Sequence, residues 1–176
     1  MTHDSTETVV FGFADRELFP IIESASRVPG HVSLQVCKDD KVRYLEIRLQ
    51  PGVALPEGDD RSGRVIALHL PPIAIHGQPR SLVLDVNFDA LGYAVALDAF
   101  DASGDSVSFA FDAPRSSGWQ RVGAAFDVRR VECPVQPTRL RISFPSGNEG
   151  ASLGIATLSV MGDVRLASPG LADSGR

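Results

Sequence analysis

The chain has 176 residues, of which 43% are apolar, and this length favours one domain with a substantial core. A net charge of -5 and a pI near 5.3 exclude a nucleic-acid partner, because phosphate binding needs a basic surface. No apolar run is long enough for a transmembrane helix, and the first ten residues lack the basic and apolar segments of a signal peptide, so we expect a soluble chain without membrane insertion.

The N-terminal segment combines a polar end with one strand and an ambiguous stretch. Residues 1–7 are polar and are expected to be flexible, whereas the apolar residues of 8–13 predict the first strand. Residues 14–27 fit no single pattern. Asp15 could cap a short helix there, but Pro20 is expected to stop such a helix within about one turn.

A hairpin with one solvated face follows. Apolar and polar residues alternate over 32–37 and again over 45–49, and the charged residues 38–41 between them form the turn. Residues 50–63 are the longest stretch without periodicity. Such a loop is either functional or a solvated crossover between two sheets.

The centre of the sequence, residues 79–126, predicts four consecutive strands arranged as a meander. Asp101 and Gly104 indicate a hairpin between the second and third strands, because one bonds its own backbone and the other accepts a positive φ. A polar loop leads to Trp119, and the fourth strand ends at Phe126. Period-2 alternation places one apolar set per strand on a buried face: Leu82, Leu84, Val86 and Phe88; Tyr93, Val95 and Leu97; Val107, Phe109 and Phe111.

The remaining strands flank this centre. The Pro71-Pro72 pair interrupts the first of them at an edge or bend, and a short apolar piece continues up to Gly77. In the last strand the apolar phase slips between Ile155 and Leu158, which predicts a β-bulge. The strands expected here are residues 64–70, 139–144 and 151–161.

About ten strands without crossover helices predict an all-β fold. We expect a two-sheet antiparallel β-sandwich with jelly-roll topology, because turn residues recur at the spacing typical of such folds. The single domain should cover residues 8–166, between a flexible N-terminus, 1–7, and a flexible tail, 167–176.

Three short segments also resemble a known family. They are the strand Pro79-Arg-Ser-Leu-Val-Leu-Asp-Val86, the strand end Asp101-Ala-Ser-Gly104, and the Gly118-Trp119 pair that opens the next strand. Over residues 64–160 their order resembles the galactose-binding-like jelly rolls, in particular carbohydrate-binding-module-like domains of bacterial extracellular and cell-envelope proteins. The resemblance implies a module that binds carbohydrate or a glycan-bearing surface without catalysis.

The family's structural calcium site is not matched. Many such modules bind calcium through an acidic residue near the first strand and another in the last strand. Here the last strand reads Ile155-Ala-Thr-Leu-Ser-Val160 and has no carboxylate. Asp15 alone cannot supply the roughly six oxygen ligands that calcium needs. We therefore expect no metal and no cofactor.

Sugar recognition requires exposed aromatic faces beside hydrogen-bonding groups. Trp119 is the first aromatic candidate, although the tryptophan of the Gly-Trp pair is usually a core residue in the resembling family. Tyr44 and Tyr93 have no such expected role in the core. The polar candidates are equally well explained as a solvated sheet face. The candidate ligand-binding residues are Tyr93, Asn87, Asp89, Arg115 and Trp119, near one end of the central strands.

The sequence gives only weak indications of a catalytic site. His69 and His76 are separated by the proline break and have no reliable metal geometry. Gly104-Asp-Ser-Val107 is similar to the nucleophile block of one class of serine esterases, but Ser106 lies at a hairpin of an all-β chain. Four acidic residues could pair as glycosidase acid and base, yet scattered carboxylates are usually solvated: Glu46, Asp85, Asp98 and Asp112. We therefore expect no enzyme.

Two functions stay open at this point. The first is a carbohydrate-binding module, extracellular or in the cell envelope if the chain is part of a larger protein. The second is a structural or assembly protein that uses the sandwich as a protein interaction scaffold, which the scarcity of exposed aromatics and the missing signal peptide favour. Cys37 and Cys133 say little about the compartment of the protein, because a small buried thiol in a strand is commoner than a disulfide.

Overall fold

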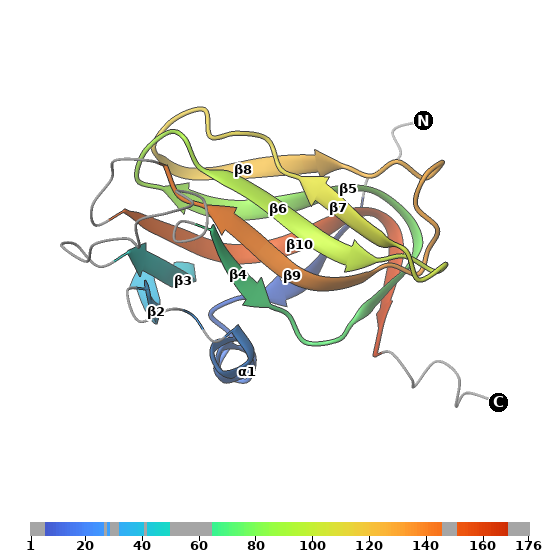
Figure 1. Cartoon of the computed structure of the whole chain (residues 1–176), viewed down its shortest axis with the longest axis horizontal. Helices are drawn as coiled ribbons and strands as arrows, with labels where there is room; N and C mark the ends of the chain where they lie inside the picture. The colour runs from blue at the N-terminus through green and yellow to red at the C-terminus, as the bar shows by residue number, and fades with distance from the viewer. Residues whose placement is uncertain are drawn as a thin grey trace, which may run out of the picture.

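The structure is a computed structural model that describes residues 6–26, 28, 32–40, 42–49, 65–145 and 151–168. Within these residues ten strands form two antiparallel sheets, one lying in front of the other in Figure 1, so the expected β-sandwich is confirmed. The expectations for residues 1–5, for the whole 50–63 loop and for residues 169–176 lie outside the described residues.

The larger sheet has six strands with β10 at its centre. Its hydrogen-bonded order is β2-β3-β10-β5-β8, and β1 pairs with β10 beyond the point where β3 stops pairing. The strands are β1 (Glu7–Gly12), β2 (Val32–Asp39), β3 (Val42–Leu49), β5 (Ala74–Phe88), β8 (Gly118–Ala125) and β10 (Ser152–Ala167). The expected β2–β3 hairpin and the expected bulge in β10, at the register shift between Ile155 and Thr157, are both confirmed.

The smaller sheet has four strands in the order β4-β9-β6-β7. They are β4 (Val65–His69), β6 (Ala94–Phe100), β7 (Ser106–Ala110) and β9 (Gln136–Ser143). Of the four central strands only β6 and β7 form a hairpin, whereas β5 and β8 pair with each other in the larger sheet. The meander expected from the sequence is therefore wrong, because alternation identifies a strand and its buried face but not its partner.

The core lies between the inner faces of the two sheets. The four residues expected on the buried face of β5, from Leu82 to Phe88, are at most 1% exposed, as alternation predicts. The two cysteines are free, but both are half-buried, and Cys133 lies before β9 and not in a strand. The largest fully buried side chains are Phe13, Phe88, Ile22, Leu45, Ile47, Leu68, Ile75, Leu82, Leu84, Leu97, Leu140 and Ile142.

A short helix, α1 (Leu18–Ser26), lies beside β4 at the foot of the sandwich in Figure 1. Asp15 caps it, since its Oδ1 accepts hydrogen bonds from the backbone N–H groups of Glu17 and Leu18 at 2.8 and 3.2 Å. The expected stop at Pro20 is wrong, because the helix continues to Ser26; at this early position the proline removes one backbone hydrogen bond, to the carbonyl of Arg16, without ending the helix. No helix in the described ranges has the length and apolarity to span a membrane.

Strands β5 and β10 continue together beyond the larger sheet through a bend. Gly77 and Gly162 occupy it with φ angles of 107° and 130°, so β5 runs on through Gly77, where the sequence suggested an end. Beyond the bend Ile75 exchanges two backbone hydrogen bonds, 2.8 and 3.0 Å long, with Val135, which leads into β9. The end of β5 thus connects the two sheets.

Candidate functional site

Two aromatic side chains meet on the outer face of the larger sheet. Tyr44 comes from β3 and Trp119 from β8, with β10 and β5 between them. Three strand spacings separate these strands by about 14 Å on a flat sheet. The ring centroids are nevertheless only 5.1 Å apart, at an interplanar angle of 79°. Both side chains therefore lie along the face toward each other, and Trp119 remains 37% exposed.

Gly154 on β10 makes room for this pair. The register aligns it with Glu46 on one side and Asn87 on the other, and Asn87 in turn aligns with Trp119. A Cβ atom on Gly154 would lie 2.9 Å from Cδ2 of Tyr44. Because real Cβ atoms do not approach so closely, the glycine leaves the space that the tyrosine ring occupies.

The same face is strongly curved. The indole Nε1 of Trp119 lies 3.4 Å from Asp39 Oδ2, although β8 and β2 are the two ends of the sheet. Four strand spacings on a flat sheet would be about 19 Å. Arg121 of β8 likewise forms an ion pair with Glu7 of β1. These contacts across the sheet show that it is curved, and we call its outer face around Tyr44, Asn87 and Trp119 the trough below.

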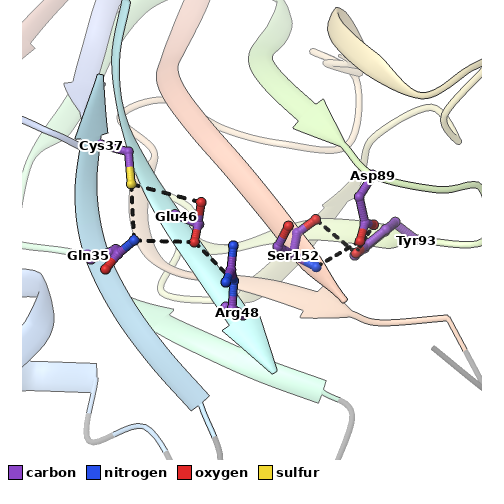
Figure 2. Close-up of polar contacts among 7 residues, drawn as sticks. All are labelled: Gln35, Cys37, Glu46, Arg48, Asp89, Tyr93 and Ser152. Carbon is purple, nitrogen blue, oxygen red and sulfur yellow. Dashed lines mark hydrogen bonds and ion pairs between the residues drawn. The ribbon is translucent and has the colours of Figure 1, made fainter. Parts of the chain in front are cut away.

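Polar side chains line the trough. Arg121 Nε lies 3.0 Å from Asp85 Oδ1, and the Thr157 hydroxyl donates to Asp85 Oδ2 at 2.8 Å. On the β2–β3 side, Glu46 Oε1 lies 3.2 Å from Arg48 Nε and 3.4 Å from Gln35 Nε2, as Figure 2 shows.

The charge of the trough is negative. Its ionic side chains comprise four carboxylates and two guanidiniums, an excess of two negative charges: Glu7, Asp39, Glu46, Asp85, Arg48 and Arg121. Burial raises the pKa of the Tyr44 phenol, and the neighbouring Cys37, Glu46 and Asp39 raise it further. The phenol thus keeps its proton and can donate a hydrogen bond.

Tyr93 lies beside the trough but inside the core. It is 3% exposed, and its ring packs against Phe88 and Phe144, each with centroids 5.3 Å away. Its hydroxyl lies 2.5 Å from Asp89 Oδ1 and 3.0 Å from the carbonyl oxygen of Ser152, whose N–H donates to Asp89 Oδ2 at 2.9 Å (Figure 2). Burial, followed by the hydrogen bond and charge of Asp89, raises the pKa of Tyr93. Tyr93 and Asp89 therefore fasten the connection after β5 to the start of β10.

The structure separates the five candidate residues into two pairs and the isolated Arg115. Asn87 and Trp119 lie next to each other in the trough. Tyr93 and Asp89 are engaged with each other and Ser152. Arg115 is exposed in the β7–β8 connection, where its backbone N–H donates to Gln120 Oε1 at 3.1 Å. Tyr44, noted in the sequence only as a free aromatic, joins the first pair. Its pairing with Trp119 depends on strand order, for which the sequence has no local signal.

The serine-esterase interpretation gains no support from the contacts of Ser106. His69 lies on β4 and Ser106 on β7, the two outer strands of the smaller sheet. Both line one pocket on the outer face of that sheet, but among the described residues no hydrogen bond joins His69 to Ser106. Asp98 is engaged by two arginines rather than by the histidine. Within the described residues, these three side chains do not form a catalytic triad.

Asp98 should make stability depend on pH. It is 9% exposed, and Oδ2 accepts hydrogen bonds from the Nε atoms of Arg139 and Arg141 at 2.6 and 2.7 Å. Burial alone would raise its pKa, but the bonds from Arg141, Arg139 and Ser108 outweigh burial, and the pKa lies below the ordinary 3.8. The stabilisation is therefore complete above about pH 4 and is lost as pH falls through the lowered native pKa.

We expect Asp98→Asn to lower the free energy of unfolding by about 1 to 2 kcal/mol at pH 7, since both arginines are partly solvated. Urea denaturation at pH 7 and at pH 2.5 measures this. Asp163→Asn, at an exposed carboxylate of β10, is the control. An equal effect of Asp98→Asn at both pH values would show that the carboxylate charge does not stabilise the fold.

Comparison with known proteins finds similarity in structure only. Neither protein-family models nor curated proteins match the sequence. A family 29 carbohydrate-binding module matches with a TM-score of 0.44 and 14% identity over 89% of this chain and 88% of that one. A family 30 module matches with a TM-score of 0.48 and 9% identity, over 79% of this chain and 88% of that one. The solution structure of CtCBM11 matches with a TM-score of 0.49 and 10% identity, over 94% of this chain and 100% of that one. These likenesses are remote and do not show what this chain binds.

Proposed function

We propose that the chain is a non-catalytic carbohydrate-binding module whose ligand lies in the trough. The observation that supports this most is the Trp119–Tyr44 pair, which presents a partly exposed indole beside the amide of Asn87. A pyranose ring has an apolar C–H face that packs on an aromatic ring and hydroxyls that need nearby polar partners. The trough offers an aromatic face at Trp119 and a polar partner at Asn87, which are aligned on neighbouring strands.

We further propose that the glycan is uncharged. The carboxylates of the trough can accept hydrogen bonds from sugar hydroxyls, and bonds to charged acceptors are strong. Their excess negative charge would repel an acidic sugar, because like charges at short range repel each other. In this proposal Asp39, Glu46 and Asp85 contact hydroxyls and do not act as catalysts, since each already bonds a neighbouring side chain.

The protein-scaffold alternative gains no support from the described surface. Its exposed large apolar side chains lie on separate elements: Val9, Ile21, Val42, Val65, Leu91, Phe100, Trp119 and Val128. Exposed apolar side chains in such numbers are ordinary on a protein surface. We place the module in an extracellular or cell-envelope protein as part of the same proposal.

Trp119→Ala should weaken glycan binding about tenfold or more, the factor that corresponds to about 1.4 kcal/mol of lost stacking. A glycan array identifies the bound oligosaccharides, and calorimetry on the strongest one gives the Kd of both proteins. Because Trp119 is 37% exposed, the fold should tolerate the change.

The matched control is Val128→Ala, which truncates an exposed apolar side chain in the connection after β8. It should leave the Kd unchanged. Trp119→Phe should retain part of the affinity, because it keeps an aromatic face. A folded wild-type chain that binds no uncharged glycan, or equal affinity of Trp119→Ala and wild type, would contradict the proposal.

A further inference from the structure

The outer face of the smaller sheet contains a pocket of about 310 Å³, on the opposite side of the sandwich from the trough. Asp98, Arg139 and Arg141 lie in it, and His69 and Phe100 also line it. The register explains the grouping, since His69, Arg139 and Asp98 stand side by side on β4, β9 and β6.

The pocket has an excess of positive charge. Two guanidiniums share the single carboxylate of Asp98, so one positive charge is left uncompensated in a chain whose net charge is -5. The trough has the opposite sign. The two faces of the sandwich are therefore suited to ligands of different charge.

Asp98 also fixes how the arginines are presented. Its Oδ2 accepts a hydrogen bond from the Nε–H of each guanidinium, and one Nη of Arg141 donates to Ser108 Oγ at 3.0 Å. Among the described residues the Nη groups of Arg139 have no hydrogen-bond partner, and this side chain is 47% exposed. A guanidinium whose orientation is fixed and whose outer N–H groups are unused can bind a planar oxyanion through two parallel hydrogen bonds.

We propose that this pocket binds the carboxylate of a monosaccharide-sized organic acid. Arg139 contacts the carboxylate, Arg141 adds its charge, and the Phe100 ring, 48% exposed, covers an apolar side of the ligand. The volume is at the small end of the range for small-molecule pockets, about 300 to 1,000 Å³, which suits one sugar-sized ring. This site is independent of the trough and does not require that the trough bind glycan.

The test is a titration of the full chain with three probes, followed by the amide chemical shifts of a ¹⁵N-labelled sample. The probes are glucuronate, glucose and inorganic phosphate. Glucuronate should shift amides of β6, β7 and β9 and bind at least tenfold more tightly than either other probe. Arg139→Gln should weaken glucuronate binding at least tenfold, whereas Arg139→Lys, which keeps the charge without the planar fork, should recover only part of the affinity.

Trp119→Ala separates this site from the trough. It should leave glucuronate binding unchanged, whatever the result with uncharged glycans. The proposal is overturned if glucose binds as tightly as glucuronate, if phosphate binds more tightly, or if Trp119→Ala rather than Arg139→Gln removes glucuronate binding. An unfolding curve of Arg139→Gln checks that this variant is folded, so that a loss of glucuronate binding reports the missing guanidinium and not unfolding.

Discussion

Replacing Gly162 with alanine should lower the free energy of unfolding by about 2 to 4 kcal/mol, which combines backbone strain with a steric clash. Gly162 has φ = 130°, a conformation that residues with a Cβ atom rarely adopt. An added Cβ would lie 2.5 Å from the carbonyl oxygen of Gln78 on the paired strand. Neither β5 nor β10 can move away easily, because each is hydrogen bonded on both sides of the bend.

Two other glycines separate these causes. Gly104 also has a positive φ, 84°, but a Cβ there meets nothing within 4 Å, so Gly104→Ala should cost only about 1 kcal/mol. Gly12 has neither a positive φ nor a neighbour within 4 Å, and Gly12→Ala should be nearly neutral. Urea unfolding of the three variants should rank them in this order. If Gly162→Ala costs no more than Gly104→Ala, the close packing at the bend does not contribute.

Tyr93→Ala should destabilise the chain by about 3 to 5 kcal/mol, the usual cost of removing a large aromatic from a core. The ring is 3% exposed between Phe88 and Phe144, and the substitution leaves a cavity there. It also leaves Asp89 without the phenol that lies 2.5 Å from its Oδ1. Lost binding in this variant would therefore report unfolding and not a missing ligand contact.

Tyr93→Phe isolates the hydroxyl. It keeps the packing and removes the contacts with Asp89 and Ser152, so we expect a loss of about 1 to 2 kcal/mol. Thermal unfolding of both variants, with glycan binding measured well below the midpoint, distinguishes the two effects. A Tyr93→Ala protein that is as stable as wild type, yet no longer binds, would instead make Tyr93 a ligand contact.

The strands and their buried faces could be predicted from the sequence. Alternation in residues 82–88 has a direct physical cause, because successive side chains of a strand point to opposite faces and only one face meets the core. The bulge after Ile155 was visible for the same reason, as a shift in that alternation. Partner strands were not visible, since β5 pairs with β8 and β10 across long stretches of sequence, and the expected meander was wrong.

The helix shows a second limit of local rules. Pro20 has no N–H to donate, which costs one helical hydrogen bond. Near the helix start this loss is tolerated, because Pro20 is the third residue of α1 and the helix continues for six residues beyond it, to Ser26.

The candidate site could be predicted only in part. Trp119 and Asn87 could be named as candidates because a Gly-Trp pair and a polar residue on a solvated strand face can be recognised locally. Tyr93 has the same local features as an exposed tyrosine, and its burial follows from the packing of Phe144, some fifty residues later. The roles of Tyr44 and Gly154 depend on strand order and sheet curvature, which only the folded chain defines.

The link between Ile75 and Val135 has a consequence for how the chain unfolds. Each sheet has its own hydrogen-bond network, and two such layers could in principle open at different free energies. The exchanged backbone bonds at Ile75 join β5 of one network to the segment entering β9 of the other, and the shared core lies between them. We therefore expect the most protected amides of β9 and of β10 to exchange with solvent only through global unfolding, with the same opening free energy in native-state hydrogen exchange.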